Sequence, residues 1–145
     1  MSDVSANAML AVSPRVALTV PDIEREGVVN HRSIFEWTTD DYPAVVDLAR
    51  RMTAYIESNE LDTLVFEWFG NEDTGKVVWY QVYPDDEAFL RHARNMKEAG
   101  FSEEAQQLLT QSRLLLLTPL THPQAKEMAN RLDAEQLAPI TGVVR

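Results

Sequence analysis

A strand that is apolar on both faces, followed at once by an amphipathic helix, constrains the fold of this chain more than any other feature. The strand is predicted over Lys76–Tyr83, where valine and aromatic side chains alternate and Gln81 is the polar exception. Such a strand needs cover above and below the sheet. Asp85 can cap the helix that follows, and the apolar stripe of this helix contains His92. We therefore expect His92 to face the sheet, near Gln81 and Tyr83.

The composition limits the classes of function that need to be considered. A chain of 145 residues is expected to form a single domain with a substantial core. The net charge of -10 and the pI near 4.6 argue against nucleic acid and against an acidic membrane surface as partners. Without cysteine, disulfides and thiolate metal sites are excluded. We see neither a signal peptide nor a membrane span and expect a cytoplasmic protein.

The first residues of the chain differ in character from the rest. Residues 1–28 contain Ser, Asn and Pro punctuation around one short candidate strand, Arg15–Val20. They are read as an N-terminal leader, either poorly ordered or acting as an arm that adds an edge strand to a sheet. Residues 29–145 are predicted to form the folded domain, including a C-terminal helix and tail.

The order of the predicted elements indicates an α+β fold. The sequence predicts strands over 33–38, 63–69, 76–83 and 113–120, helices after Asp40 or Asp41, after Asp85 and from Pro123, and a short helix capped by Ser102. This is the split βαβ order of a ferredoxin-like sandwich, with a four-stranded antiparallel sheet and its two main helices on one face.

A sheet covered on one face leaves the other face to be explained. Its strands carry apolar side chains on both sides, and an open apolar face of that size is rare on soluble monomers. We therefore expect a homodimer in which two sheets pack face to face around a two-fold axis, so that the chain itself is a partner.

The segment from Trp79 to His92 resembles the antibiotic biosynthesis monooxygenase domain family, the dimeric α+β barrels. The resemblance rests on Trp79-Tyr80-Gln81-Val82-Tyr83 and on the helix with Asp85, Ala88, Phe89 and His92. It covers His31 to Arg145. It implies a dimeric α+β barrel and, among the activities of the family, a cofactor-independent monooxygenase acting on a hydroxylated aromatic molecule of the quinol or anthrone type.

His92, Tyr83 and Gln81 are the predicted catalytic residues. The ordinary pKa of histidine suits a general base for a phenol or quinol. Gln81 and Tyr83 would orient the oxygen atoms of the substrate. In the alternative interpretation, His92 is a partly buried histidine whose hydrogen bonds are satisfied by Gln81 or Tyr83.

The predicted substrate-binding residues are aromatic and apolar side chains of the same region, together with one carboxylate: Trp79, Trp68, Phe66, Phe89, Met96 and Glu36. They could line a slot that stacks a planar small molecule, or they could be ordinary core residues. Strand alternation does not decide whether Glu36 reaches the cavity or the solvent.

Two other functions remain open at this point. One is a non-catalytic homodimer that binds a small apolar ligand or has a structural role. The other is a haem-handling protein, although Gln81 stands where a Glu is common in the family and Tyr83 stands where the haem-degrading members carry Trp. No metal-ligand spacing connects His31 or His122 with another histidine, so we expect no metal and no cofactor.

Overall fold

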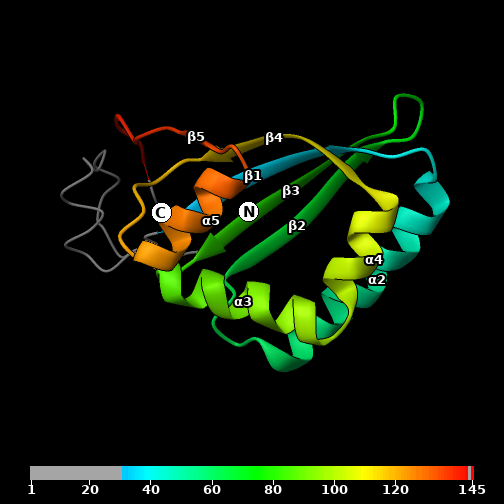
Figure 1. The fold of residues 1–145 in the computed structure, drawn as a ribbon, viewed down its shortest axis with the longest axis horizontal. Helices are drawn as coiled ribbons and strands as arrows, with labels where there is room; N and C mark the ends of the chain where they lie inside the picture. The colour runs from blue at the N-terminus through cyan, green and yellow to red at the C-terminus, as the bar shows by residue number, and fades with distance from the viewer. Residues whose placement is uncertain (1–30, 144) are drawn as a thin grey trace.

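The computed structural model describes residues 31–143 and 145, and the predicted leader, residues 1–28, lies outside them. The described part is an α+β fold with one sheet (Figure 1). Its elements are β1 (His31–Thr38), α2 (Tyr42–Asn59), β2 (Val65–Asn71), β3 (Lys76–Tyr83), α3 (Asp86–Glu98), α4 (Phe101–Leu108), β4 (Thr110–Leu116), α5 (Pro123–Arg131) and β5 (Glu135–Gln136).

The sheet has the strand order β2-β3-β1-β4-β5, with β1 in the centre. The first four strands in this order pair antiparallel, whereas β5 pairs parallel to β4. The sheet among the described residues is therefore five-stranded. The prediction of four strands did not include β5, which is two residues long. This strand exists because the chain returns from α5 along the free edge of β4, where Leu137 N donates to Leu116 O at 2.8 Å.

The helix starts follow from side-chain capping. Asp41 accepts a hydrogen bond from Ala44 N at 3.2 Å, and Asp85 accepts one from Ala88 N at 2.8 Å. Ser102 was predicted to cap the short helix, but Gly100 occupies the N-cap position. Gly100 has φ of 85°, a left-handed conformation that glycine adopts without steric cost and that turns the chain from α3 into α4.

Three strands differ from their predicted bounds. β1 begins at His31 because its first residues pair with the end of β3. β2 covers Val65–Asn71, since it pairs with β3 as far as the turn. β4 covers Thr110–Leu116 instead of 113–120, because its polar start pairs with the end of β1. Pairing partners, and not apolar content, decide these ends.

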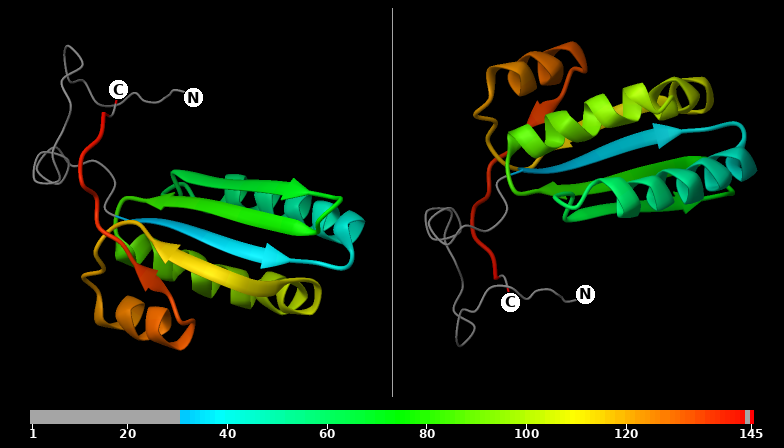
Figure 2. Two further views of the ribbon diagram at one scale, coloured as in Figure 1. Left: turned by 90° about the horizontal axis from the view of Figure 1, so that it is seen from above. Right: turned by 90° about the horizontal axis from the view of Figure 1, so that it is seen from below.

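The core lies between the sheet and helices α2, α3 and α4, which cover one face (Figure 2). The sheet contributes buried side chains such as Phe35, Trp79 and Leu114, and the helices contribute Leu48 and Phe89. In the left panel of Figure 2, none of the described helices lies over the other face of the sheet.

The face without helices is only partly apolar. Ile34, Val78, Tyr80 and Leu115 are half-buried on it, and Arg113 Nη2 donates to Glu36 Oε2 at 3.0 Å. The ion pair shows that this face is less uniformly apolar than the strand pattern suggests.

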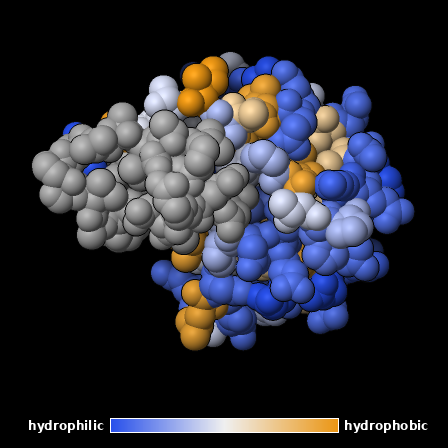
Figure 3. All heavy atoms as spheres, turned by 90° about the vertical axis from the view of Figure 1, so that its left-hand side faces the viewer, coloured by the Kyte–Doolittle hydropathy of each residue, from blue (hydrophilic) through white to orange (hydrophobic). Residues whose placement is uncertain are grey.

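Among the described residues, no helix is both long enough and apolar enough to cross a membrane. Among the coloured residues, the end of the molecule in Figure 3 is largely hydrophilic, with apolar residues in separate small groups.

Candidate functional site

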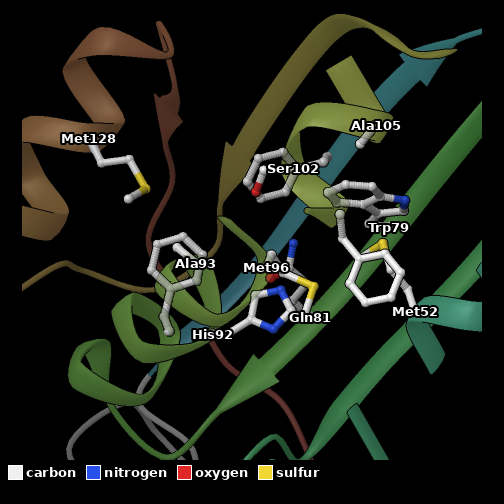
Figure 4. Close-up of a pocket in the computed structure, with 12 residues that line it drawn as sticks. Met52, Trp79, Gln81, His92, Ala93, Met96, Ser102, Ala105 and Met128 are labelled. Carbon is white, nitrogen blue, oxygen red and sulfur yellow. The ribbon is translucent and has the colours of Figure 1, made fainter. Parts of the chain in front are cut away.

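A cavity of about 120 Å³ lies between the helix-covered face of the sheet and helices α2 to α5 (Figure 4). It is partly open to solvent and lined mainly by apolar side chains. The polar lining residues are Gln81 from β3, His92 from α3 and Ser102 from α4; the apolar ones are Phe35, Met52, Trp79, Phe89, Ala93, Met96, Phe101, Ala105 and Met128. An apolar wall with a few polar groups is typical of a small-molecule site.

His92 is the titratable side chain among the described residues that line this cavity. Its ring projects from the apolar stripe of α3 towards Gln81 and Met96 (Figure 4). The side chain is 6% exposed, and its Nδ1 atom lies 2.8 Å from Oε1 of Glu60. The hydrogen-bond partner of His92 is therefore a buried carboxylate, not Gln81 or Tyr83.

Glu60 is placed by the end of α2. It is the C-cap residue of this helix, and its own N–H donates to Ile56 O at 2.9 Å. The carboxylate also accepts hydrogen bonds from Thr63 Oγ1 at 2.8 Å and from Asn95 Nδ2 at 3.0 Å. Burial alone would raise the pKa of Glu60, but the hydrogen bonds from His92, Thr63 and Asn95 outweigh it and lower this pKa.

The ionised state of Glu60 decides which nitrogen of His92 carries the proton. A carboxylate can only accept, so Nδ1 of His92 must donate to it. In the neutral ring, Nε2 is then the nitrogen with a free lone pair. A histidine oriented in this way by a carboxylate is equipped to remove a proton from a hydroxyl group in the cavity.

Gln81 and Tyr83 form a second polar pair, next to His92. The hydroxyl of Tyr83 donates to Oε1 of Gln81 at 2.7 Å. Tyr83 is fully buried, and burial, followed by the charges of Glu60 and Asp62, raises its pKa well above the ordinary value. Tyr83 therefore remains a protonated phenol that holds the carboxamide of Gln81, and it does not line the cavity itself.

The structure brings only part of the predicted binding set to the cavity. Trp79, Phe89 and Met96 line it, together with His92 and Gln81. Phe66 packs behind the site, with its ring centroid 5.0 Å from that of His92. Trp68 is partly buried and packs against the core, with its ring centroid 5.0 Å from that of Trp79.

Glu36 does not belong to the site. Because side chains alternate along β1, Glu36 points to the face without helices, whereas Phe35 points into the cavity. The carboxylate is held there by Arg113 and by Lys76, whose Nζ atom lies 3.7 Å away. The hydrogen bond and the charge of Arg113, helped by Lys76, lower the pKa of Glu36.

The sequence reasoning missed Glu60 as the partner of His92. The two residues are 32 positions apart, and no spacing rule connects the end of one helix to the middle of another. A weak local signal exists, because a threonine follows Glu60 at the third position, where its hydroxyl can donate to the carboxylate. The contribution of α4 and α5 to the wall was also missed.

A second buried pair joins His31 to Asp86. Nδ1 of His31 lies 3.1 Å from Oδ1 of Asp86, and the ring stacks on Phe89 with centroids 4.2 Å apart. Oδ2 of Asp86 accepts hydrogen bonds from the backbone N–H groups of Thr121 at 2.6 Å and of His122 at 3.0 Å. Burial alone would raise the pKa of Asp86, but the hydrogen bond with His31 and those from the backbone of Thr121 and His122 lower this pKa to about 2. Neither residue of this pair lines the cavity.

Metal ligation has no support in the described part of the chain. Residues 31–143 and 145 contain no group of three or more His, Asp or Glu side chains placed to hold a metal ion.

Comparison with known protein families and with curated proteins gives no match to the sequence. Solved structures do resemble the fold. The crystal structure of MupZ from Pseudomonas fluorescens matches with a TM-score of 0.65 and 14% identity, over 81% of this chain and 91% of MupZ. PA3566 from Pseudomonas aeruginosa matches with a TM-score of 0.50 and 19% identity, over 63% of this chain and 96% of PA3566. At these identities the similarity concerns the fold: a small mixed α+β domain.

Proposed function

We propose that this protein is a cofactor-independent monooxygenase, and that His92 is the base that activates a hydroxylated aromatic ring. The observation that carries the proposal is the hydrogen bond between Glu60 and Nδ1 of His92. It leaves the other ring nitrogen as a proton acceptor beside a mainly apolar cavity.

The volume of the cavity favours a single-ring substrate. An apolar cavity of about 150 Å³ holds one benzene molecule, and the cavity beside His92 measures about 120 Å³. Phenols and hydroquinones with one ring are therefore the preferred class, and tricyclic anthrones are disfavoured. A porphyrin is far larger, so the cavity does not favour a haem-handling role.

The reaction requires dioxygen as co-substrate and balances without another reductant. Nε2 of His92 takes the hydroxyl proton, and the resulting arenolate transfers an electron to dioxygen. The two radicals combine, which forms a bond between a ring carbon and oxygen. The imidazolium returns its proton to the peroxide. Loss of the ring hydrogen as a proton then breaks the O–O bond and releases water. A phenol and one dioxygen thus give a quinone and one water molecule.

The neighbouring residues support these steps. Tyr83 occupies the carboxamide oxygen of Gln81, so the amide nitrogen of Gln81 remains as the group that can donate to an oxygen of the substrate. Trp79 and Phe89 supply flat apolar walls. An apolar site also weakens the solvation of the arenolate, which makes it a stronger electron donor.

Oxygen consumption tests this proposal directly. We would measure dioxygen uptake with phenol and methylhydroquinone in the presence of wild type, His92→Ala and Glu98→Lys, subtracting the autoxidation seen without protein. Glu98 is exposed at the end of α3 and serves as the control. Uptake by wild type and Glu98→Lys, but not by His92→Ala, is expected. No uptake above background over a broad panel of hydroxyarenes would refute the catalytic role.

A non-catalytic ligand-binding or structural protein is the second candidate. It is favoured by the apolar character of the cavity wall, to which the described part of the chain contributes three polar side chains, Gln81, His92 and Ser102. This candidate predicts binding of phenol by calorimetry without any dioxygen uptake.

We further propose that the domain is a ferredoxin-like dimeric α+β barrel of the antibiotic biosynthesis monooxygenase type. The order β2-β3-β1-β4 of the antiparallel strands supports this assignment, and half-buried residues such as Tyr80 on the face without helices support a second copy as its cover. Light scattering after size exclusion should show a dimer for wild type and a monomer for Tyr80→Glu. A stable wild-type monomer at micromolar concentration would rule out the dimer.

A further inference from the structure

Helix α5 closes one end of the cavity with a single side chain. Met128 is the one residue of α5 that lines the cavity. In Figure 4 it lies at one end, Met52 lies at the other, and His92, Gln81 and Met96 lie between them. Met128 is half-buried, so its removal would extend the cavity towards the surface.

We infer that Met128 sets the size of the aromatic ring system that the cavity accepts, and that with Met128 in place the ligand is limited to one ring. The inference rests on the proposed function only in using the same cavity. A cavity of about 120 Å³ has no room for a second fused ring. Of the two ends, the one formed by Met52 is deep in the core, since Met52 is 1% exposed. The end at Met128 is therefore where a larger ligand could extend.

For this limit to hold, α5 must be fixed in place, and it is anchored at both ends. Before its first turn, the backbone N–H groups of Thr121 and His122 donate to Asp86 at 2.6 and 3.0 Å. After its last turn, Nε2 of Gln111 donates to Leu132 O at 2.9 Å, and β5 pairs with β4. In the middle, Ala125 is 1% exposed and docks the helix on the core.

These contacts at both ends of α5 fix the backbone position of Met128 relative to the cavity. Methionine is a flexible side chain that fills irregular space. It can adjust its rotamer, but the helix that carries it cannot retreat without breaking the bonds to Asp86 and Gln111. The backbone position of α5 thus restricts the length of the ligand, and the side chain at position 128 determines how much of that length is free.

Four variants at or beside this position separate size from chemistry. Met128→Ala lengthens the cavity, Met128→Leu keeps its volume, and Met128→Trp shortens it. Glu127→Ala changes an exposed neighbour on the same helix and serves as the matched control. Circular dichroism and thermal unfolding of each variant show that α5 and the domain remain folded.

Isothermal titration calorimetry of the full chain with phenol and 1-naphthol tests the inference. This experiment measures binding and does not depend on dioxygen consumption. Wild type, Met128→Leu and Glu127→Ala should bind phenol and discriminate against 1-naphthol. Met128→Ala should bind 1-naphthol at least tenfold more tightly than wild type, and Met128→Trp should lose phenol. Equal binding of both ligands by wild type, an unchanged ratio in Met128→Ala, or no binding of phenol to folded wild type would overturn it. A changed ratio without dioxygen uptake in any protein would leave the size limit intact and remove the catalytic proposal alone.

Discussion

Residues 31–143 contain two buried pairs of a histidine and a carboxylate, and the two pairs differ in their surroundings. In both pairs the Nδ1 atom faces the carboxylate, at 2.8 Å for His92 and Glu60 and at 3.1 Å for His31 and Asp86. Helix α3 contributes to both, with Asp86 in its first turn and His92 further along. His92 lines the cavity, whereas His31 is fully buried and its Nε2 atom has no hydrogen-bond partner among the residues that the structure describes.

The comparison shows that a buried histidine–carboxylate pair is not by itself evidence of a functional site. An unpartnered buried nitrogen costs about 1–3 kcal/mol, so His31 is held at an energetic cost. Stacking on Phe89 and the anchoring of the chain near Thr121 by Asp86 offset this cost. His92 has the same local chemistry, but this residue lines a cavity, whereas His31 does not.

The sharpest contrast should come from replacing each histidine in turn. His92→Ala removes the proposed base and should lower kcat for dioxygen uptake by about 10²–10⁴-fold. His31→Ala leaves the cavity residues in place but removes a partner of the buried Asp86, which should destabilise the fold by about 3 kcal/mol. Initial rates and urea unfolding of both proteins measure the two effects. Equal loss of activity in folded His31→Ala would end the distinction between the pairs.

The next largest effect is expected from the carboxylate that orients His92. Glu60→Gln keeps the shape of the side chain, but its amide can donate to Nδ1 and so favours the wrong tautomer of the imidazole. We expect kcat to fall by about 100-fold with little change in KM, because Glu60 does not line the cavity. Glu60→Asp should restore part of the rate. A fall in stability with unchanged kcat would assign Glu60 a structural role only.

Acid should reveal Asp86 through the stability of the fold. The pKa of this carboxyl is lowered from 3.8 to about 2 in the folded protein. The folded state therefore resists protonation, so the contribution of Asp86 is complete above about pH 4 and is lost as the pH falls towards 2. The shift corresponds to about 2 kcal/mol at 1.36 kcal/mol per pKa unit.

Urea unfolding of wild type and Asp86→Asn between pH 2 and pH 6 measures this contribution. The lowered pKa of Glu60 acts in the same direction and is present in both proteins, so the difference between them isolates Asp86. Parallel stability curves for the two proteins over this range would contradict the assignment.

The smallest effects should come from the two threonine hydroxyls that donate to the carboxylates. Thr63 Oγ1 lies 2.8 Å from Glu60, and Thr121 Oγ1 lies 3.2 Å from Asp86, which also keeps the backbone N–H of Thr121. Thr63→Val should cost about 1 kcal/mol and Thr121→Val less. Only Thr63→Val should also reduce kcat. Thermal unfolding and initial rates distinguish the two variants. Equal effects of both variants on kcat would argue against a special role of the Glu60–His92 pair.

Local patterns predicted much of the fold. The strand at Lys76–Tyr83, the cap at Asp85 and the helix start at Pro123 agree with the structure, and Asp41 is the cap of the two candidates Asp40 and Asp41. Capping and alternation act between near neighbours. The ends of β2 and β4 and the existence of β5 were not predicted, since they depend on pairing with strands far away in the chain.

The lining of the cavity was half predictable for the same reason. His92 and Gln81 line it, and a polar residue on an apolar face is visible in the sequence; Glu36 lies on the other face of the sheet, a choice that alternation leaves open. Met128 was not recognised as part of the site, because α5 reaches the cavity only through the return of the chain past Asp86.

The sequence by itself determined the order of the four longer strands and of the helices, the burial of His92 on the inner stripe of α3 and the acidic character of the chain. Only the tertiary structure decided which histidine lines a cavity, which carboxylate orients this histidine and which side chain lies at the end of the cavity. The physical reason is that periodicity and capping depend on residues close together in the sequence. Cavities and buried pairs form where elements distant in the chain pack together.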